Sequence, residues 1–115
     1  MFFGAERVLN EKKYYFCKLV DITQFITNML LVVYNIEDDT VTNGILVKAN
    51  EFGETNQILP NSFLLDTSSE VVEVFNALKI IMANKGRIMI AKIHRKEING
   101  WLGTASVDWI NAKSF

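Results

Sequence analysis

The chain has 115 residues, of which 50% are hydrophobic and 22% charged, and its formal net charge is −1. This composition indicates one compact domain and excludes intrinsic disorder as the main description. The single cysteine, Cys17, cannot form an internal disulfide, and the single histidine, His94, cannot complete a Cys/His zinc cluster. We therefore expect no bound metal and no cofactor.

The charges are unevenly distributed along the chain. Residues 37–76 carry one lysine and eight acidic residues, whereas residues 77–115 carry seven basic residues and two acidic ones. A basic surface on a mildly acidic protein is compatible with an anionic ligand, and it is equally compatible with a solvated surface that has no partner. No apolar run reaches the roughly 18 residues of a membrane span, and the N-terminus lacks the order of a secretory signal. These features predict a cytoplasmic protein with no membrane partner.

The first half of the chain predicts three strands. Residues 13–22 are rich in aromatic and β-branched side chains, and residues 28–36 form a more continuously apolar run that is typical of a strand buried on both faces. Residues 37–40, Glu-Asp-Asp-Thr, have turn chemistry and predict a hairpin to a third strand at residues 43–50. Residues 51–67 then read as a long connection that can hold a short strand at residues 62–65.

A helix is predicted after this connection. Thr67, Ser68, Ser69 and Glu70 match a capping box, and Lys85 followed by Gly86 matches a helix end. Between them apolar side chains recur at helical spacing, namely Val71, Val74, Phe75, Leu78, Ile81 and Met82.

The last part of the chain predicts a hairpin. Residues 87–95 form a strand without breakers, Asn99 and Gly100 suit a type I′ turn, and residues 101–110 form the return strand. The resulting pairing places Lys92, His94 and Lys96 on one face with Trp101 and Trp109. Two points stay open: Trp109 can be a core or a contact residue, and a bulge at Gly103 would shift the strand that follows.

Three strands, a helix and two strands over residues 14–110 resemble the element order of the OB-fold, a five-stranded barrel with one helix between strands 3 and 4. The resemblance implies a mainly β protein, with residues 1–115 forming a single OB-like domain. The chain is similar to the short single-stranded-DNA-binding proteins of phages and mobile elements, which act in DNA replication or recombination. Residues 111–115 share a terminal Phe with the bacterial cellular members but lack their acidic tail and its Pro, so the recruiting function of that tail is not expected.

Aromatic and basic residues on the sheet would form the binding surface, because bases stack on aromatic rings while cations contact the phosphates. Tyr14 fits a half-buried strand equally well, and the hydroxyl of Tyr34 could equally reach solvent at the strand edge. The candidate nucleic-acid contacts are Lys12, Lys13, Tyr14, Lys18, Tyr34, Lys92, His94, Lys96 and Trp101.

Catalysis is not expected. His94 is the only histidine that could act as a base, Cys17 lies in a predicted strand where a free cysteine is inert, and no glycine-rich phosphate loop occurs. We therefore expect a non-catalytic protein that binds single-stranded DNA, with RNA as a possible ligand, and that forms a homo-oligomer. The alternative is a protein-interaction or assembly subunit that does not bind nucleic acid. A third interpretation is a small α+β fold in which the helix covers one face of an open sheet.

Overall fold

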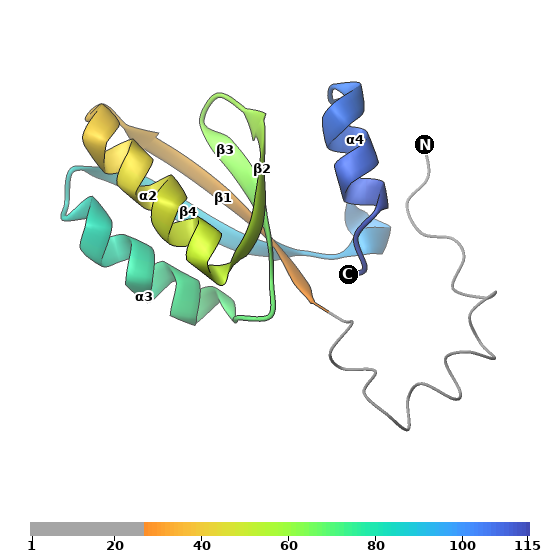
Figure 1. The fold of residues 1–115 in the computed structure, drawn as a ribbon, viewed down its shortest axis with the longest axis horizontal. Coiled ribbons are helices and arrows are strands. Elements are labelled where there is room, and N and C mark those ends of the chain that lie inside the picture. The colour runs from red at the N-terminus through yellow and green to blue at the C-terminus, as the bar shows by residue number, and fades with distance from the viewer. Residues whose placement is uncertain (1–26) are drawn as a thin grey trace.

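The computed structural model describes residues 27–115 (Figure 1). Four strands form one antiparallel sheet in the order β2-β3-β1-β4. The elements in chain order are β1 (Asn28–Ile36), α2 (Asp39–Phe52), β2 (Gly53–Leu59), β3 (Ser62–Thr67), α3 (Val71–Met82), β4 (Gly86–Ile93), the 3-10 helix η2 (Arg95–Glu97) and α4 (Thr104–Asn111).

The first six elements of the described residues follow the order β-α-β-β-α-β of the split βαβ, or ferredoxin-like, arrangement. Helices α2 and α3 lie side by side over one face of the sheet, which we call the helix face (Figure 1). Helix α4 packs at one end of the opposite face, which we call the second face. Because many unrelated proteins share this arrangement, the fold by itself does not indicate a function.

The main core lies between the helix face of the sheet and the helices α2 and α3. Alternate side chains of β1 point toward α2 and α3, as the period of two in a strand requires. The buried members of this core are Leu30, Val32, Tyr34, Ile45, Ala49, Phe63, Leu65, Val74, Leu78 and Met82.

The predicted five-stranded barrel is wrong. The residues that the structure describes form an open four-stranded sheet with helices on it, as in the third interpretation of the sequence. The predicted strand at residues 13–22 lies outside the described residues. The strand predicted at residues 28–36 is confirmed as β1, which is central in the sheet and pairs with both β3 and β4.

The largest error concerns residues 43–50, which lie in helix α2 and not in a strand. Asp38 caps this helix, because its carboxylate accepts hydrogen bonds from the backbone N–H groups of Thr40 and Val41 at 2.9 and 3.3 Å. The same local bonding chemistry had suggested a turn. Ile45 and Ala49 are buried one helical turn apart, a spacing that the β-branched composition of the segment concealed.

The segment predicted as a long connection, residues 51–67, instead holds the last two residues of α2 and a hairpin of two strands, β2 and β3. The short strand expected at residues 62–65 is confirmed as the central part of β3. The helix predicted after it is also confirmed, although its capping box is formed by Glu70 and Glu73, and it ends at Ala83 in a left-handed conformation.

The predicted C-terminal hairpin is half correct. Its first strand is confirmed as β4, but the segment from residue 101 to residue 110 contains helix α4 in place of the return strand. Asn99 and Gly100 lie in a connection without regular secondary structure, in which the side-chain oxygen of Asn99 accepts a hydrogen bond from the backbone N–H of Gly100 at 2.8 Å. Gly103 is the residue before the helix and does not form a bulge.

Candidate functional site

Helix α4 and the chain end build a second apolar cluster on the second face of the sheet. Met29 of β1, Leu64 of β3 and Ile110 of α4 are its buried members. Leu31, Ile58, Ile93, Leu102, Trp109 and Phe115 pack around them. The cluster explains Trp109, which is half-buried against the sheet and is a packing residue.

Arg95 positions α4 relative to the end of β4. Its guanidinium donates hydrogen bonds to the backbone carbonyls of Ile110, at 3.3 Å, and Lys113, and it lies 4.4 Å from the centre of the Phe115 ring. A cation at the C-terminal end of a helix satisfies carbonyls that have no partner within the helix. Arg95 is therefore a structural residue, although its charge contributed to the basic count of the sequence.

An ionic contact ties the chain end to the sheet. The ammonium of Lys113 lies 2.5 Å from a carboxylate oxygen of Glu54 on β2 and 3.5 Å from one of Asp66 on β3, and 4.8 Å from the centre of the Trp109 ring. The hydrogen bond and the charge of Lys113 lower the pKa of Glu54 below its ordinary value. The hydrogen bond to Glu54 raises the pKa of Lys113, against an opposing effect of burial.

The connection between β4 and α4, residues 94–103, exposes an aromatic side chain and basic side chains. We call it the β4–α4 loop. Trp101 is 98% exposed, the largest value among the exposed apolar side chains. His94 and Lys96 in the same loop are exposed, and so is Lys92 one residue before the end of β4. A fully exposed indole is uncommon, because aromatic side chains gain much from burial.

The other candidate contacts do not join this group. Tyr34 is 5% exposed, its ring centre lies 6.0 Å from that of Phe63, and burial raises the pKa of its hydroxyl. Its ring is therefore not available to a base. Lys12, Lys13, Tyr14 and Lys18 lie outside the described residues.

The predicted aromatic and basic sheet face is absent from residues 27–115. Lys92 pairs with Leu30 and so belongs to the helix side of the edge strand, whereas His94, Lys96 and Trp101 lie beyond the sheet. In RNA-recognition modules of similar topology, aromatic residues on a four-stranded sheet stack the bases. Here the second-face positions of β1 and β3 are occupied by Met29, Leu31, Val33, Asn35, Ser62, Leu64 and Asp66.

The second face instead presents an apolar row that the sequence analysis missed. Val33 pairs with Ser62 on one side and with Met89 on the other, and Leu59 pairs with Ser62 beyond a bulge. Leu59 is 57% and Met89 60% exposed. Only the strand register brings these residues into one row, which no spacing within one segment could reveal.

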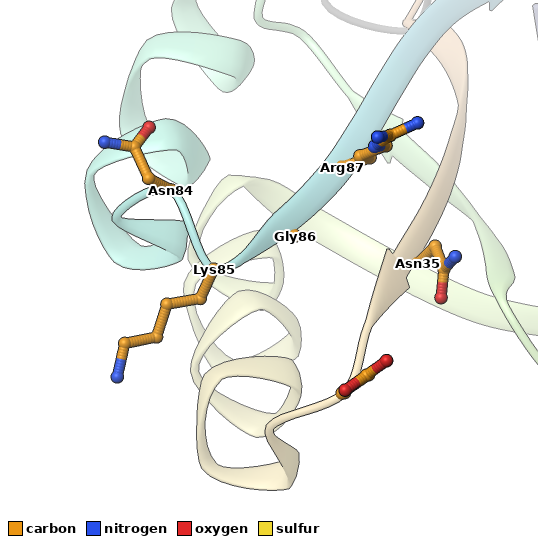
Figure 2. Close-up of a pocket in the computed structure, with 6 residues that line it drawn as sticks. Asn35, Asn84, Lys85, Gly86 and Arg87 are labelled. Atoms are coloured by element: carbon orange, nitrogen blue, oxygen red, sulfur yellow. The ribbon is translucent and has the colours of Figure 1, made fainter.

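A polar depression lies where β1 ends and β4 begins (Figure 2). Asn35, Glu37, Asn84, Lys85, Gly86 and Arg87 line it. Figure 2 shows Asn84 and Lys85 pointing away from Arg87 and Asn35, and Lys85 instead lies 3.9 Å from Asp38. Because the polar groups diverge, the depression does not form a site for a small molecule.

Among residues 27–115, no group of three or more His, Cys, Asp or Glu side chains is arranged to hold a metal ion. A search of the same residues for a long apolar helix able to cross a membrane finds none. Comparison of the chain with protein-family models, with curated proteins and with solved structures finds no match.

Proposed function

We propose that this chain is a non-catalytic module that binds single-stranded DNA through the β4–α4 loop. The observation that carries the proposal is the 98% exposure of Trp101 in a loop that also holds the exposed side chains of His94 and Lys96. The exposed side chain of Lys92 at the end of β4 adds a further cation. This surface differs from the sheet face that the sequence suggested.

The chemistry of the loop suits a flexible anionic chain with aromatic units. An exposed indole can stack on a base, which contributes about 1–3 kcal/mol per base. Lysine side chains such as Lys92 and Lys96 contact phosphates. Contacts of this kind depend little on base sequence, so the proposal is for general binding of single strands.

Tryptophan fluorescence provides the direct test. The sequence contains two tryptophans, so the variant Trp109→Phe leaves Trp101 as the only indole reporter. Titration of this variant with oligo-dT should quench its fluorescence, and added salt should weaken binding steeply because counterions are released from the phosphates. Absence of quenching at low salt would refute the proposal. Oligo-U in parallel distinguishes DNA from RNA as the preferred strand.

Two substitutions locate the binding surface. Trp101→Ala should weaken oligo-dT binding by about 1–3 kcal/mol, measured by anisotropy of a labelled oligonucleotide. Lys96→Gln should weaken binding and reduce its salt dependence, whereas Lys79→Gln, which removes an exposed cation from α3, should leave both unchanged. Equal effects at the two lysines would indicate nonspecific attraction and would count against the loop.

The alternative function is a protein-interaction or assembly subunit without nucleic-acid binding. The exposed apolar row on the second face favours it, since contiguous apolar surface marks protein contacts. The oligo-dT titration separates the two functions: an oligomer that ignores DNA at low salt supports the alternative.

A further inference from the structure

We propose that the second face of the sheet binds the second face of another copy of this chain, forming a two-fold dimer in which α4 of each copy lies over the open end of the partner's sheet. This inference goes beyond the nucleic-acid proposal and does not depend on it.

The open end of the second face carries the apolar surface of the dimer. Val33 and Met89 are directly paired across β1 and β4, and Leu31 and Ala91 form the next pair toward α4. Leu59 extends the row on the other side of Ser62. Met89 and Leu59 are more than half exposed, whereas Ile88 and Ile90, which flank Met89 on the helix face of β4, are partly buried against the main core. An antiparallel sheet commonly leaves one face in water, but that face is then polar.

The shape of the second face is that of a step. Its one end is covered by α4 through Ile110 and Trp109, while its other end, around Val33 and Met89, carries no element among the described residues. In a dimer with a two-fold axis, α4 of each copy can therefore pack on the open end of the other copy's sheet, around Val33 and Met89. A two-fold interface requires self-complementarity of this kind.

The charges of the two halves are also complementary. Arg87 lies two residues before Met89 on the same face of β4. Asp108 lies on the outer side of α4 with Ala105 and Ala112, which are also exposed. Neither Arg87 nor Asp108 belongs to an ion pair within residues 27–115. The two small alanines allow close approach to a sheet, and the packing described above brings Asp108 of one copy toward Arg87 of the other. This complementarity selects a second copy as the occupant of the face.

Light scattering after gel filtration tests the dimer with the full chain and without nucleic acid. The wild-type chain should have the mass of a dimer at micromolar concentration, and Met89→Asp should have the mass of a monomer. Ile80→Asp is the matched control, because Ile80 is 77% exposed on α3 and so places the same charge on a different surface. Circular dichroism checks that both variants remain folded. A monomeric wild-type chain, or dissociation by Ile80→Asp as well, would overturn the proposal.

A charge exchange tests the relative orientation of the two copies. Arg87→Glu and Asp108→Lys should each raise the dimer dissociation constant by at least about tenfold, because each places like charges together. The double variant should restore the wild-type constant, since the pair is re-formed with reversed signs. Additive weakening in the double variant would refute the packing of α4 against the partner's sheet. Both side chains are exposed, so these variants remain informative even if Met89→Asp fails to fold.

Discussion

The two faces of the sheet are built in different ways. On the helix face, α2 and α3 cover alternate residues of all three strands that contribute to the core, and Leu30, Val32 and Phe63 have no exposed surface. On the second face, α4 covers one end only, and Met89 and Leu59 remain more than half exposed. Buried apolar area is the main source of folding free energy, so the helix face provides most of the stability.

This difference separates stability from recognition in the molecule. A face that is already covered has no surface to offer a partner, whereas the second face and the β4–α4 loop expose an apolar row and an unburied indole. Contiguous exposed apolar surface often marks a contact with another molecule, which is the basis of both proposals. The four predictions that follow test this separation, beginning with the largest expected effect.

Truncation in the main core should have the greatest effect on stability. Phe63→Ala removes a side chain with 0% exposure, and it should lower the free energy of unfolding by about 3–5 kcal/mol in urea denaturation. Ile110→Ala, in the smaller cluster of the second face, should have a smaller effect because fewer buried side chains surround it. A larger loss for Ile110→Ala would contradict the difference between the two faces.

Removal of the link between β4 and α4 should have an intermediate effect. Arg95→Met deletes the charged hydrogen bonds to the carbonyls of Ile110 and Lys113, and it should cost about 1.5–3 kcal/mol. Hydrogen exchange should increase most in α4 and little in β1. Lys96→Met is the control, because the side chain of Lys96, the residue after Arg95, is exposed. This change should leave the hydrogen exchange of α4 unchanged. Uniform acceleration over the sheet would show that α4 is not a separate unit.

The contact of Lys113 with Glu54 should make a smaller, pH-dependent contribution. The pKa of Glu54 is lowered from 4.5, so its contribution is present above pH 4.5 and is lost as the pH falls through the lowered value. The pKa of Lys113 is raised from 10.5, so its contribution is present below pH 10.5 and is lost as the pH rises through the raised value. The stability difference between wild type and Lys113→Met should therefore be greatest between these limits and decline in acid, which thermal unfolding at several pH values would measure. A difference that is constant with pH would mean that packing of the lysine stem dominates.

The smallest effect on stability is expected at Trp101. Because its side chain is 98% exposed, Trp101→Ala should change the free energy of unfolding by no more than about 0.5 kcal/mol, although it removes a large aromatic group. Trp109→Ala should destabilise clearly, because that ring packs against the sheet in the second apolar cluster. Similar losses at both positions, measured by urea denaturation, would show that Trp101 has a structural role.

The residues proposed for function were predictable to different degrees. Lys92, His94, Lys96 and Trp101 were selected because the predicted C-terminal hairpin placed them on one face. They are exposed, as a contact requires, but that sheet face does not exist in the described chain. The predicted pairing of residues 87–95 with residues 101–110 was wrong. It was based on Asn99-Gly100, which is a local turn signal, whereas the contact of Arg95 with the end of α4 is a tertiary contact. A local signal does not register such a contact.

The sequence by itself determined the elements whose apolar pattern has one interpretation: β1, α3 and β4. It did not determine α2, since the segment around Ile45 combines β-branched composition with helical spacing, and burial against α3 and the sheet decided between them. Only the tertiary structure decided that Tyr34 is buried and that Val33 and Met89 form one row. The physical reason is that faces of a sheet are defined by pairing between strands, and pairing partners lie far apart in the chain.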